Sequence, residues 1–499
     1  MTWRRQSPKA FIGIALALLV STAGCVDEKI VYRDGPNFAA PPAAAASFLG
    51  YNDDVNKATT CGSCHVGQQA KWKSTKHADA FKTLETSGQS QGFCQACHTV
   101  NNLGNVATDT TAGWRSTKDK RYHDVQCESC HGAGLQHVQS PTRGQMLASV
   151  KADTGRALTT GCSECHTGTH HPFVEEWRSS RHATSYTRGY NSLTSTPTAP
   201  EVPGGPRAAC VSCHVGQNVL ANWGVNTNYA EKSLGQTNAT AVGVTCAVCH
   251  DPHGSPNAGN LRFATDARDL DNNLCMKCHY RRSVPDFSGS QNSPHSPQGP
   301  MLLGQAGWWP PGIQIDGDIV ASHGSERNPK LCATCHVNKY EVTDKATGKF
   351  VQNVTGHRFA AIPCVDANGL PTTSQNCTIT ARSFKSCAGS GCHTEATART
   401  IMLGAEADIL LLANALQTML IDSRVPASAK LSGQVSTWRG ATFNRNLALH
   451  PGSEVHNPFL AKALLRASIA QMAKDYGITP PIALSLLAPY DKQILARSN

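Results

Sequence analysis

The sequence predicts a loop-rich, mainly α-helical fold with little β structure, in which something other than side-chain packing supplies much of the core. Glycine and proline are frequent, with 42 and 27 residues in a chain of 499, and both favour turns over long regular elements. Aromatic residues make up 6 % of the chain and all hydrophobic residues 40 %, which is thin for a core of this length. Cysteine and histidine, with 21 residues each, are therefore the residues around which a core is expected.

The N-terminus has the pattern of an export signal. Basic residues precede an apolar stretch from about residue 10 to residue 20, which is too short to span a membrane. The stretch ends in STAGC, which resembles a bacterial lipobox, although Thr22 stands where an aliphatic residue is usual. We expect a lipoprotein signal peptide over residues 1–24 and lipid attachment at Cys25. Ordinary cleavage after a small residue is the alternative.

Composition divides the rest of the chain into three parts. Residues 25–57 contain PPAAAAS and, after Cys25, no cysteine, which is typical of a flexible tether. Residues 58–395 hold every other cysteine and are expected to form the main domain. Residues 396–499 lack cysteine and are expected to be a C-terminal helical segment that packs on this domain.

Two stretches of the C-terminal segment have helical periodicity. Residues 406–421 carry a broad apolar face. Residues 456–477 form the clearer pattern, because Asn457 suits the N-cap, Pro458 the first turn and Gly477 the end of a helix.

The charge pattern argues against nucleic acid as a partner. The formal net charge is +10, but the basic residues are scattered along the chain rather than clustered in runs. We therefore expect no nucleic-acid interface.

Cys-x-x-Cys-His occurs eight times in the main domain. Two thiols with this spacing can both bond to one edge of a haem, and the next residue then carries its imidazole under the iron. Disulfides or zinc sites also use paired cysteines, but neither needs a histidine after every second cysteine. The motifs therefore predict eight haem c groups. The expected attachment residues are Cys61, Cys64, Cys94, Cys97, Cys127, Cys130, Cys162, Cys165, Cys210, Cys213, Cys246, Cys249, Cys275, Cys278, Cys332 and Cys335. The expected proximal iron ligands are His65, His98, His131, His166, His214, His250, His279 and His336.

A stretched version of the motif, CAGSGCH, has four residues between Cys387 and Cys392. With Cys364 and Cys377 these are the cysteines left over, and four thiols allow three ways of forming two disulfides, or a four-thiolate metal site. Only Cys392 is followed by a histidine, His393, and the glycines between the cysteines allow a bulged loop. We predict a ninth haem here, with His393 as proximal ligand, and a disulfide between Cys364 and Cys377.

The remaining histidines are numerous enough to give each iron a second ligand. Twelve lie outside the motifs, whereas the chain has only seven methionines. We therefore expect two histidines on most or all irons, which leaves no vacant position for a substrate. The candidates for the second, distal position are His77, His123, His137, His182, His253, His295, His323, His357 and His456. Of the neighbours His170 and His171, at most one is expected to bind iron.

These segments resemble the multihaem c-type cytochrome superfamily. GVTCAVCHDPHGSPN…NLCMKCH, within residues 243–279, is similar to its doubled Cys-x-x-Cys-His module, and VQCESCHGAGLQHV resembles another recurring module. The likeness covers roughly residues 58–395 and VHNPFLAKALLRAS in the tail. It implies a loop-rich fold organised around stacked haems with few strands. It also implies respiratory electron transfer, including outer-membrane conduits to extracellular acceptors, while a minority of members are reductases or oxidases.

We expect an exported, lipid-anchored electron-transfer cytochrome without catalytic residues, in the periplasm or at the outer membrane or cell surface. Expected partners are other cytochromes, a porin–cytochrome conduit or an extracellular acceptor. One alternative is a multihaem oxidoreductase with one open catalytic haem, acting on nitrogen or sulfur oxyanions. The Cys-x-x-Cys-Lys motif of ammonia-forming nitrite reductases is absent from the sequence. Another alternative is a subunit of a cytochrome filament.

Overall fold

The computed structural model describes ten stretches of the chain. They are residues 48–100, 113–143, 146–152, 161–186, 208–225, 228–232, 241–289, 293–313, 317–389 and 391–481. All of them belong to one compact unit, Pro41–Asn499. The expected signal peptide, Cys25 and most of the tether lie outside the described residues, so these expectations stay predictions.

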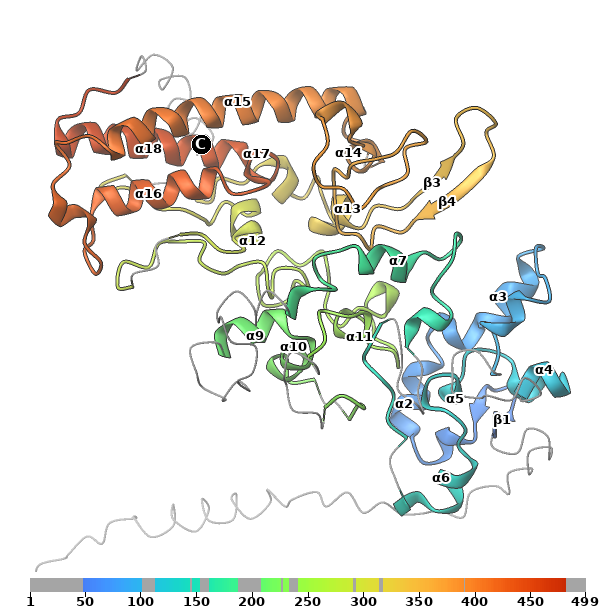
Figure 1. Ribbon diagram of the computed structural model, residues 1–499. Coiled ribbons are helices and arrows are strands. Elements are labelled where there is room, and N and C mark those ends of the chain that lie inside the picture. Colours follow the sequence, from blue (N-terminus) through green and yellow to red (C-terminus); the bar gives the residue numbers. More distant parts are fainter. Residues whose placement is uncertain are drawn as a thin grey trace, which may run out of the picture. The chain divides into compact units, whose positions relative to one another are not determined.

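Short helices joined by turns and loops make up most of the described chain (Figure 1). The α-helices are α2 (Val66–Trp72), α3 (Ala80–Thr86), α4 (Gly113–Thr117), α5 (Cys127–His131), α6 (Leu135–Gln139), α7 (Phe173–Arg178), α9 (Ala208–His214), α10 (Gly216–Asn222), α11 (Cys246–Cys249), α12 (Gln298–Leu302), α13 (Cys332–His336), α14 (Lys385–Gly389), α15 (Glu395–Leu420), α16 (Thr437–Ala448), α17 (Ser453–His456) and α18 (Pro458–Tyr476). The 3-10 helices are η2 (Cys61–Ser63), η3 (Lys76–Asp79), η4 (Cys94–Ala96), η5 (Lys120–Tyr122), η6 (Pro141–Arg143), η7 (Cys162–Glu164), η8 (Ala258–Asn260), η9 (Ser322–Gly324), η10 (Ile379–Ala381) and η11 (Ala427–Lys430).

The strands of the described residues form two small antiparallel pairs. β1 (Tyr51–Asp53) pairs with β2 (Ala58–Thr59), and β3 (Tyr340–Thr343) pairs with β4 (Phe350–Val354). The predicted loop-rich, mainly helical fold with little β structure is therefore confirmed.

The C-terminal helices enclose the largest apolar cluster of the described residues. α15, α16 and α18 pack against one another (orange to red in Figure 1), and Leu416, Leu447 and Leu464 are fully buried among them. α15 is long and apolar enough to cross a membrane, judged by length and composition alone. From Ile409 onward, the buried residues of α15 belong to this cluster.

The helix ends follow from local capping. Asn457 accepts a hydrogen bond from the Leu460 N–H (3.0 Å) at the start of α18, and Gly477 ends that helix with φ +63°, as predicted. α15 begins at Glu395 rather than at residue 406. Thr394 caps it, and the Ala-rich turns that follow favour helix although they lack an apolar face.

Buried amide side chains fasten the C-terminal helices to the main domain. Asn444 accepts a hydrogen bond from the Trp308 N–H (2.7 Å) and donates one to the Trp308 carbonyl (2.6 Å). Asn457 donates to the carbonyls of Met301 (3.2 Å) and Ile319 (2.6 Å). Because these amides are buried and bonded on several sides, they fix the position of α16 and α18 against the segment around α12.

The apolar clusters of the motif-rich part are small and separate. One surrounds Phe81, Trp114 and Tyr122, and another surrounds Val219 and Leu220. Side-chain packing alone therefore provides little continuous core there, in agreement with the thin apolar composition of the chain.

Candidate haem sites

The Cys-x-x-Cys-His motifs fold as single helical turns. α5 and α13 span complete motifs, and in the first motif the His65 N–H donates to the Cys61 carbonyl (2.9 Å). The same bond closes the motifs that begin at Cys162 (2.9 Å), Cys246 (2.8 Å) and Cys275 (3.0 Å). One turn therefore brings both thiols and the imidazole of a motif together, as covalent haem attachment requires.

The Nδ1 atom of several motif histidines meets a backbone carbonyl. The contacts are His98 with Ala80 (2.8 Å), His131 with Met146 (2.6 Å), His250 with Gly259 (2.6 Å) and His336 with Phe359 (2.8 Å). A carbonyl accepts only from a protonated Nδ1, so the neutral ring keeps the lone pair on Nε2. That is the tautomer and orientation in which a histidine binds a metal.

Eight motif histidines each face one histidine from outside the motifs. The pairs, with the distance between ring centres, are His65–His137 (6.4 Å), His166–His77 (6.1 Å), His131–His253 (6.1 Å), His279–His182 (6.2 Å), His214–His295 (6.1 Å), His250–His357 (6.3 Å), His393–His323 (6.3 Å) and His336–His456 (6.3 Å).

This spacing fits a metal ion between two imidazoles. A metal–imidazole bond is about 2 Å long and the ring centre lies about 1 Å behind the nitrogen, so two rings on opposite faces of one ion are about 6 Å apart. Ordinary aromatic contacts span a similar range, so distance alone does not decide. The pairing is also regular, because every pair joins one motif histidine to one histidine from outside the motifs.

Burial keeps several of the paired imidazoles neutral. Burial, followed by the charges of neighbouring histidines, lowers the pKa of His182 and of His456 to about 3. The same causes lower the pKa of His166 to about 4. A neutral imidazole is the form that binds iron, so the protonation state agrees with the geometry.

Cysteines of different motifs lie against one another. The thiol pairs within hydrogen-bonding reach are Cys61–Cys127, Cys97–Cys165, Cys162–Cys246, Cys213–Cys278 and Cys275–Cys332. Among the described cysteines the only disulfide is a different one, Cys364–Cys377. The turns that would carry neighbouring haems are therefore in contact through their cysteine side chains.

Family comparison covers the same motifs. A model of the doubled CXXCH motif matches residues 239–283, which hold the motifs that begin at Cys246 and Cys275. A model of cytochrome c554 and c-prime matches residues 60–132 and 161–251. The chain is a multihaem c-type cytochrome. Proteins of this class bind haem c through such motifs and transfer electrons.

The cytochrome also resembles one solved structure, the crystal structure of outer cell wall cytochrome OcwA. The TM-score is 0.47 and the sequence identity 18 %, and the match covers 78 % of each chain. No curated protein matches the chain.

Four histidines of the cytochrome are not in such pairs with motif histidines: His123, His170, His171 and His450. His123 was expected as a distal ligand. The structure instead stacks its ring on Phe81 (3.7 Å between centres) and edge-on to Trp114 (4.6 Å). The sequence indicated only that histidines outnumber irons, not which of them aromatic side chains enclose.

The stretched motif lies beside its regular neighbour. α14 carries Cys387, and Cys392 and His393 precede α15. Cys335 is close enough to Cys387 and Cys392 for their charges to interact, and His393 faces His323 as the regular motif histidines face their partners. Its surroundings therefore match those of the regular motifs.

The near-copies WKSTKHA and WRSSRHA fold in the same way. The Trp72 indole N–H donates to the Val125 carbonyl (2.9 Å), and the Val125 N–H donates to the His77 carbonyl (3.1 Å). In the second copy, Trp177 donates to Val244 (2.8 Å) and Val244 to His182 (3.1 Å). Each copy thus fixes a non-motif histidine beside the residues that precede a motif.

These copies belong to a structural repeat of motifs. We call repeat 1 the motifs that begin at Cys61, Cys94 and Cys127, repeat 2 those at Cys162, Cys210 and Cys246, and repeat 3 those at Cys275 and Cys332. In each repeat the first cysteines of the first and last motifs meet, as Cys61 meets Cys127.

Histidine pairs cross from one repeat to the next. His77 of repeat 1 faces His166, which belongs to the first motif of repeat 2. His182 occupies the equivalent place in repeat 2 and faces His279, in the first motif of repeat 3. The repeats are therefore interlocked through their histidines.

A buried carboxylate positions one non-motif histidine. Glu176 is 4 % exposed and accepts hydrogen bonds from the Thr355 N–H (2.7 Å), the Thr355 hydroxyl (2.8 Å) and the His357 N–H (2.7 Å). Three donors satisfy a carboxylate that burial would otherwise destabilise. Glu176 therefore holds the backbone from which His357 reaches His250.

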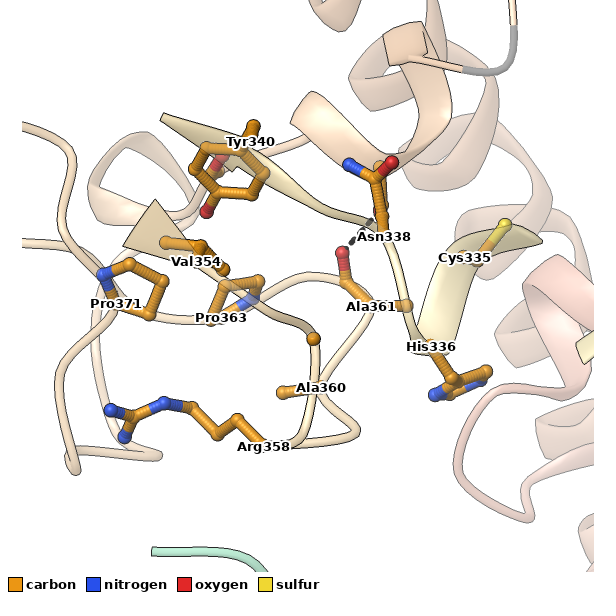
Figure 2. A pocket seen from close by; sticks show the side chains of 13 residues that line it. Cys335, His336, Asn338, Tyr340, Val354, Arg358, Ala360, Ala361, Pro363 and Pro371 are labelled. Atoms are coloured by element: carbon orange, nitrogen blue, oxygen red, sulfur yellow. Dashed lines mark hydrogen bonds between the residues drawn. The ribbon is translucent and has the colours of Figure 1, made fainter. Parts of the chain in front are cut away.

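The described cavities are of two kinds. A small cavity adjoins Cys335 and His336 (Figure 2), and its volume of about 20 Å³ has room for about one water molecule. A larger cavity of about 550 Å³ is lined by Lys71, Arg262 and Asp251, among others. The first is too small for a substrate, and the cations of the second suit carboxylate groups such as haem propionates.

Proposed function

We propose that this cytochrome relays electrons along nine covalently attached haem c groups, with two histidines on most or all irons. When bound, haem c supplies a one-electron redox couple. The observation that carries the proposal is the set of eight imidazole pairs at 6.1–6.4 Å. The paired histidines would occupy both axial positions of the iron. They would thereby bind and orient the haem and exclude a substrate from the iron.

Under this proposal the motif residues have fixed roles. The paired cysteines, including Cys387 and Cys392 with their stretched spacing, form thioether bonds. The motif histidine binds one face of the iron and its partner the other. The Nδ1 contacts with backbone carbonyls orient the motif rings, so the sites depend on loops as much as on helices.

The contacts between motifs support a continuous route. Cys130 lies near Cys162, and Cys249 lies near Cys275, so the last motif of one repeat is close to the first motif of the next. Cys335 and Cys387 connect repeat 3 to the stretched motif. With the thiol pairs within and between repeats, these contacts join all nine motifs in one branched series. The motifs that begin at Cys94 and Cys210 are its side branches.

We also propose that the cytochrome is exported and anchored by lipid on Cys25, with residues 58–395 as the haem domain and residues 396–499 as a helical segment packed on it. The pattern STAGC after a short apolar stretch supports this location. The partners would be other redox proteins, a porin–cytochrome conduit or an extracellular acceptor.

The mass of the intact mature protein tests the haem and lipid assignments. Nine haem additions per chain and a lipid-modified N-terminal Cys25 are expected. Eight haems would remove the stretched motif from the proposal, and an unmodified N-terminus would remove the anchor. Reduction by a small donor, followed by oxidation with a large extracellular acceptor such as ferric oxide particles, tests the relay itself.

One observation favours a second candidate, an oxidoreductase with one open haem. Among the described residues, which include all 21 histidines, no imidazole faces His98 at the distance seen for the other motif histidines. If that iron is open, nitrite or carbon monoxide should bind to the native protein. Failure of both to bind would leave the relay as the function.

A further inference from the structure

The haem site of His98 differs from the others in one respect. Its motif begins at Cys94 in repeat 1, and His98 is oriented by the Ala80 carbonyl as other motif histidines are oriented by theirs. The second axial position is the part of the site that the eight imidazole pairs leave unassigned. The repeat offers a way to assign it, because the equivalent motif in repeat 2 is complete.

That equivalent motif contains His214. Its second cysteine, Cys213, meets Cys278 of the next repeat. His214 faces His295, with 6.1 Å between ring centres, and His295 follows the first motif of repeat 3 in the sequence. In repeat 2, the histidine of the second of three motifs is therefore paired with a histidine that follows the first motif of the next repeat. We apply the same rule to the second motif of repeat 1.

Repeat 1 shows the same contacts. Cys97 meets Cys165 of the next repeat, and its sulfur lies 3.8 Å from the Glu164 carbonyl. Three histidines follow this first motif of repeat 2 before the next motif, and one of them, His182, already faces His279. His170 and His171 remain. By the rule, one of these two is the partner of His98.

Local contacts distinguish the two histidines. The ring of His170 stacks on Phe350 of β4, with 4.8 Å between centres and 10° between planes. Its carbonyl accepts a hydrogen bond from the Asn353 side chain (3.0 Å). His170 is thus held on the strand. His171 instead lies in the turn that follows Gly168, whose carbonyl accepts a hydrogen bond from the His171 N–H (3.0 Å).

We infer that His171 is the second axial ligand of the haem attached to Cys94 and Cys97. The inference rests on the haem assignment proposed above. It completes the set, so that all nine irons have two histidines and none is open. Gly168 begins the turn that carries His171 and has φ +85°, a conformation that glycine adopts without strain.

Ferric electron paramagnetic resonance of the holoprotein tests the inference. The wild-type protein should show only low-spin haem. His171→Ala should convert one haem of the nine to high spin, and added imidazole should reverse the change. His170→Ala should leave all haems low-spin. His295→Ala is the positive control, because it should produce one high-spin haem at the Cys210 motif.

Two results would overturn the inference. One is a wild-type protein that already contains one high-spin haem, unchanged by His171→Ala. The other is a low-spin wild-type protein that stays low-spin in His171→Ala. Haem counting by mass separates these results from failure of the haem assignment, because the count stays at nine in either case. If His171→Ala does not mature, His171→Met should raise the potential of a single haem, and no change in any potential would contradict the assignment.

Discussion

At the scale of single residues, a backbone carbonyl that accepts a hydrogen bond from Nδ1 orients a histidine ring and leaves its Nε2 atom free to bind iron. His323 has its Nδ1 atom 2.7 Å from the Val455 carbonyl, and the motif histidines have similar contacts. His170 and His123 pack on aromatic rings instead. The difference lies in tertiary neighbours, so it is invisible in the immediate sequence of each histidine.

Replacing one paired histidine should open one haem. His182→Ala should yield a high-spin ferric signal equivalent to a single haem, because His182 faces only His279 among the motif histidines. Quantitative electron paramagnetic resonance measures it. His450→Ala is the matched control, since His450 is outside the eight pairs, and it should leave the spin state unchanged. Equal effects of the two variants would contradict the pairing.

Loss of the Glu176 carboxylate should destabilise the protein. Glu176→Ala leaves three buried donors of Thr355 and His357 without their acceptor, and each such loss costs about 1–3 kcal/mol. We expect a destabilisation on the order of 3 kcal/mol, seen as a lower midpoint of thermal unfolding by circular dichroism. Glu341→Gln, at an exposed position of β3, should shift the midpoint little. A Glu176→Ala midpoint equal to that of wild type would refute this role.

At the scale of elements, short helical turns carry the motifs and longer helices hold them in place. α18 begins at Pro458 and its cap, Asn457, directly follows His456, so the cap of this helix and a proposed iron ligand are adjacent. Asn457 both caps α18 and bonds to the carbonyls of Met301 and Ile319. The end of the helix therefore fixes His456 against His336.

Removing this cap should disturb a haem as well as the helix. Asn457→Ala should lower the unfolding midpoint, because a lost N-cap costs about 1 kcal/mol, and should add a high-spin component from the His336 site. Ser436→Ala removes the cap of α16, where Ser436 accepts from the Arg439 N–H (3.2 Å), and should lower the midpoint alone. A spin change in both variants, or in neither, would count against the link between Asn457 and His456.

The sequence allowed some of these elements to be predicted and concealed others. Caps at Asn457 and Gly477 are local, so the last helix was foreseen. The start of α15 was not, because a run of alanine and threonine carries no apolar periodicity. Motif histidines are marked by their spacing, whereas their partners are not. His77 lies close to His65 in the sequence but faces His166, since tertiary contacts between repeats decide the pairing.

At the scale of the whole molecule, the apolar core is confined mainly to the C-terminal helices, and the motif-rich part has only small apolar clusters. Attached haems would supply the missing apolar contacts there. The repeats are also interlocked, because histidines of one repeat face motif histidines of the next. The motif-rich part should consequently fold only as haems are attached.

The stretched motif can be tested through the number of haems attached to the whole chain. Replacing both Cys387 and Cys392 by serine should reduce the intact mass by one haem relative to wild type, because no other motif can take over that group. Cys364→Ser with Cys377→Ser removes the disulfide and should leave the haem count unchanged. Loss of a haem in the second variant alone would show that the cysteine assignments are reversed.

We propose that this cytochrome is a relay whose irons are held between two histidines. Spin-quantified electron paramagnetic resonance of the fully oxidised holoprotein, normalised to iron per chain, tests it most directly. We expect low-spin iron for at least the eight sites with paired imidazoles. High-spin iron equivalent to several haems per chain would contradict it.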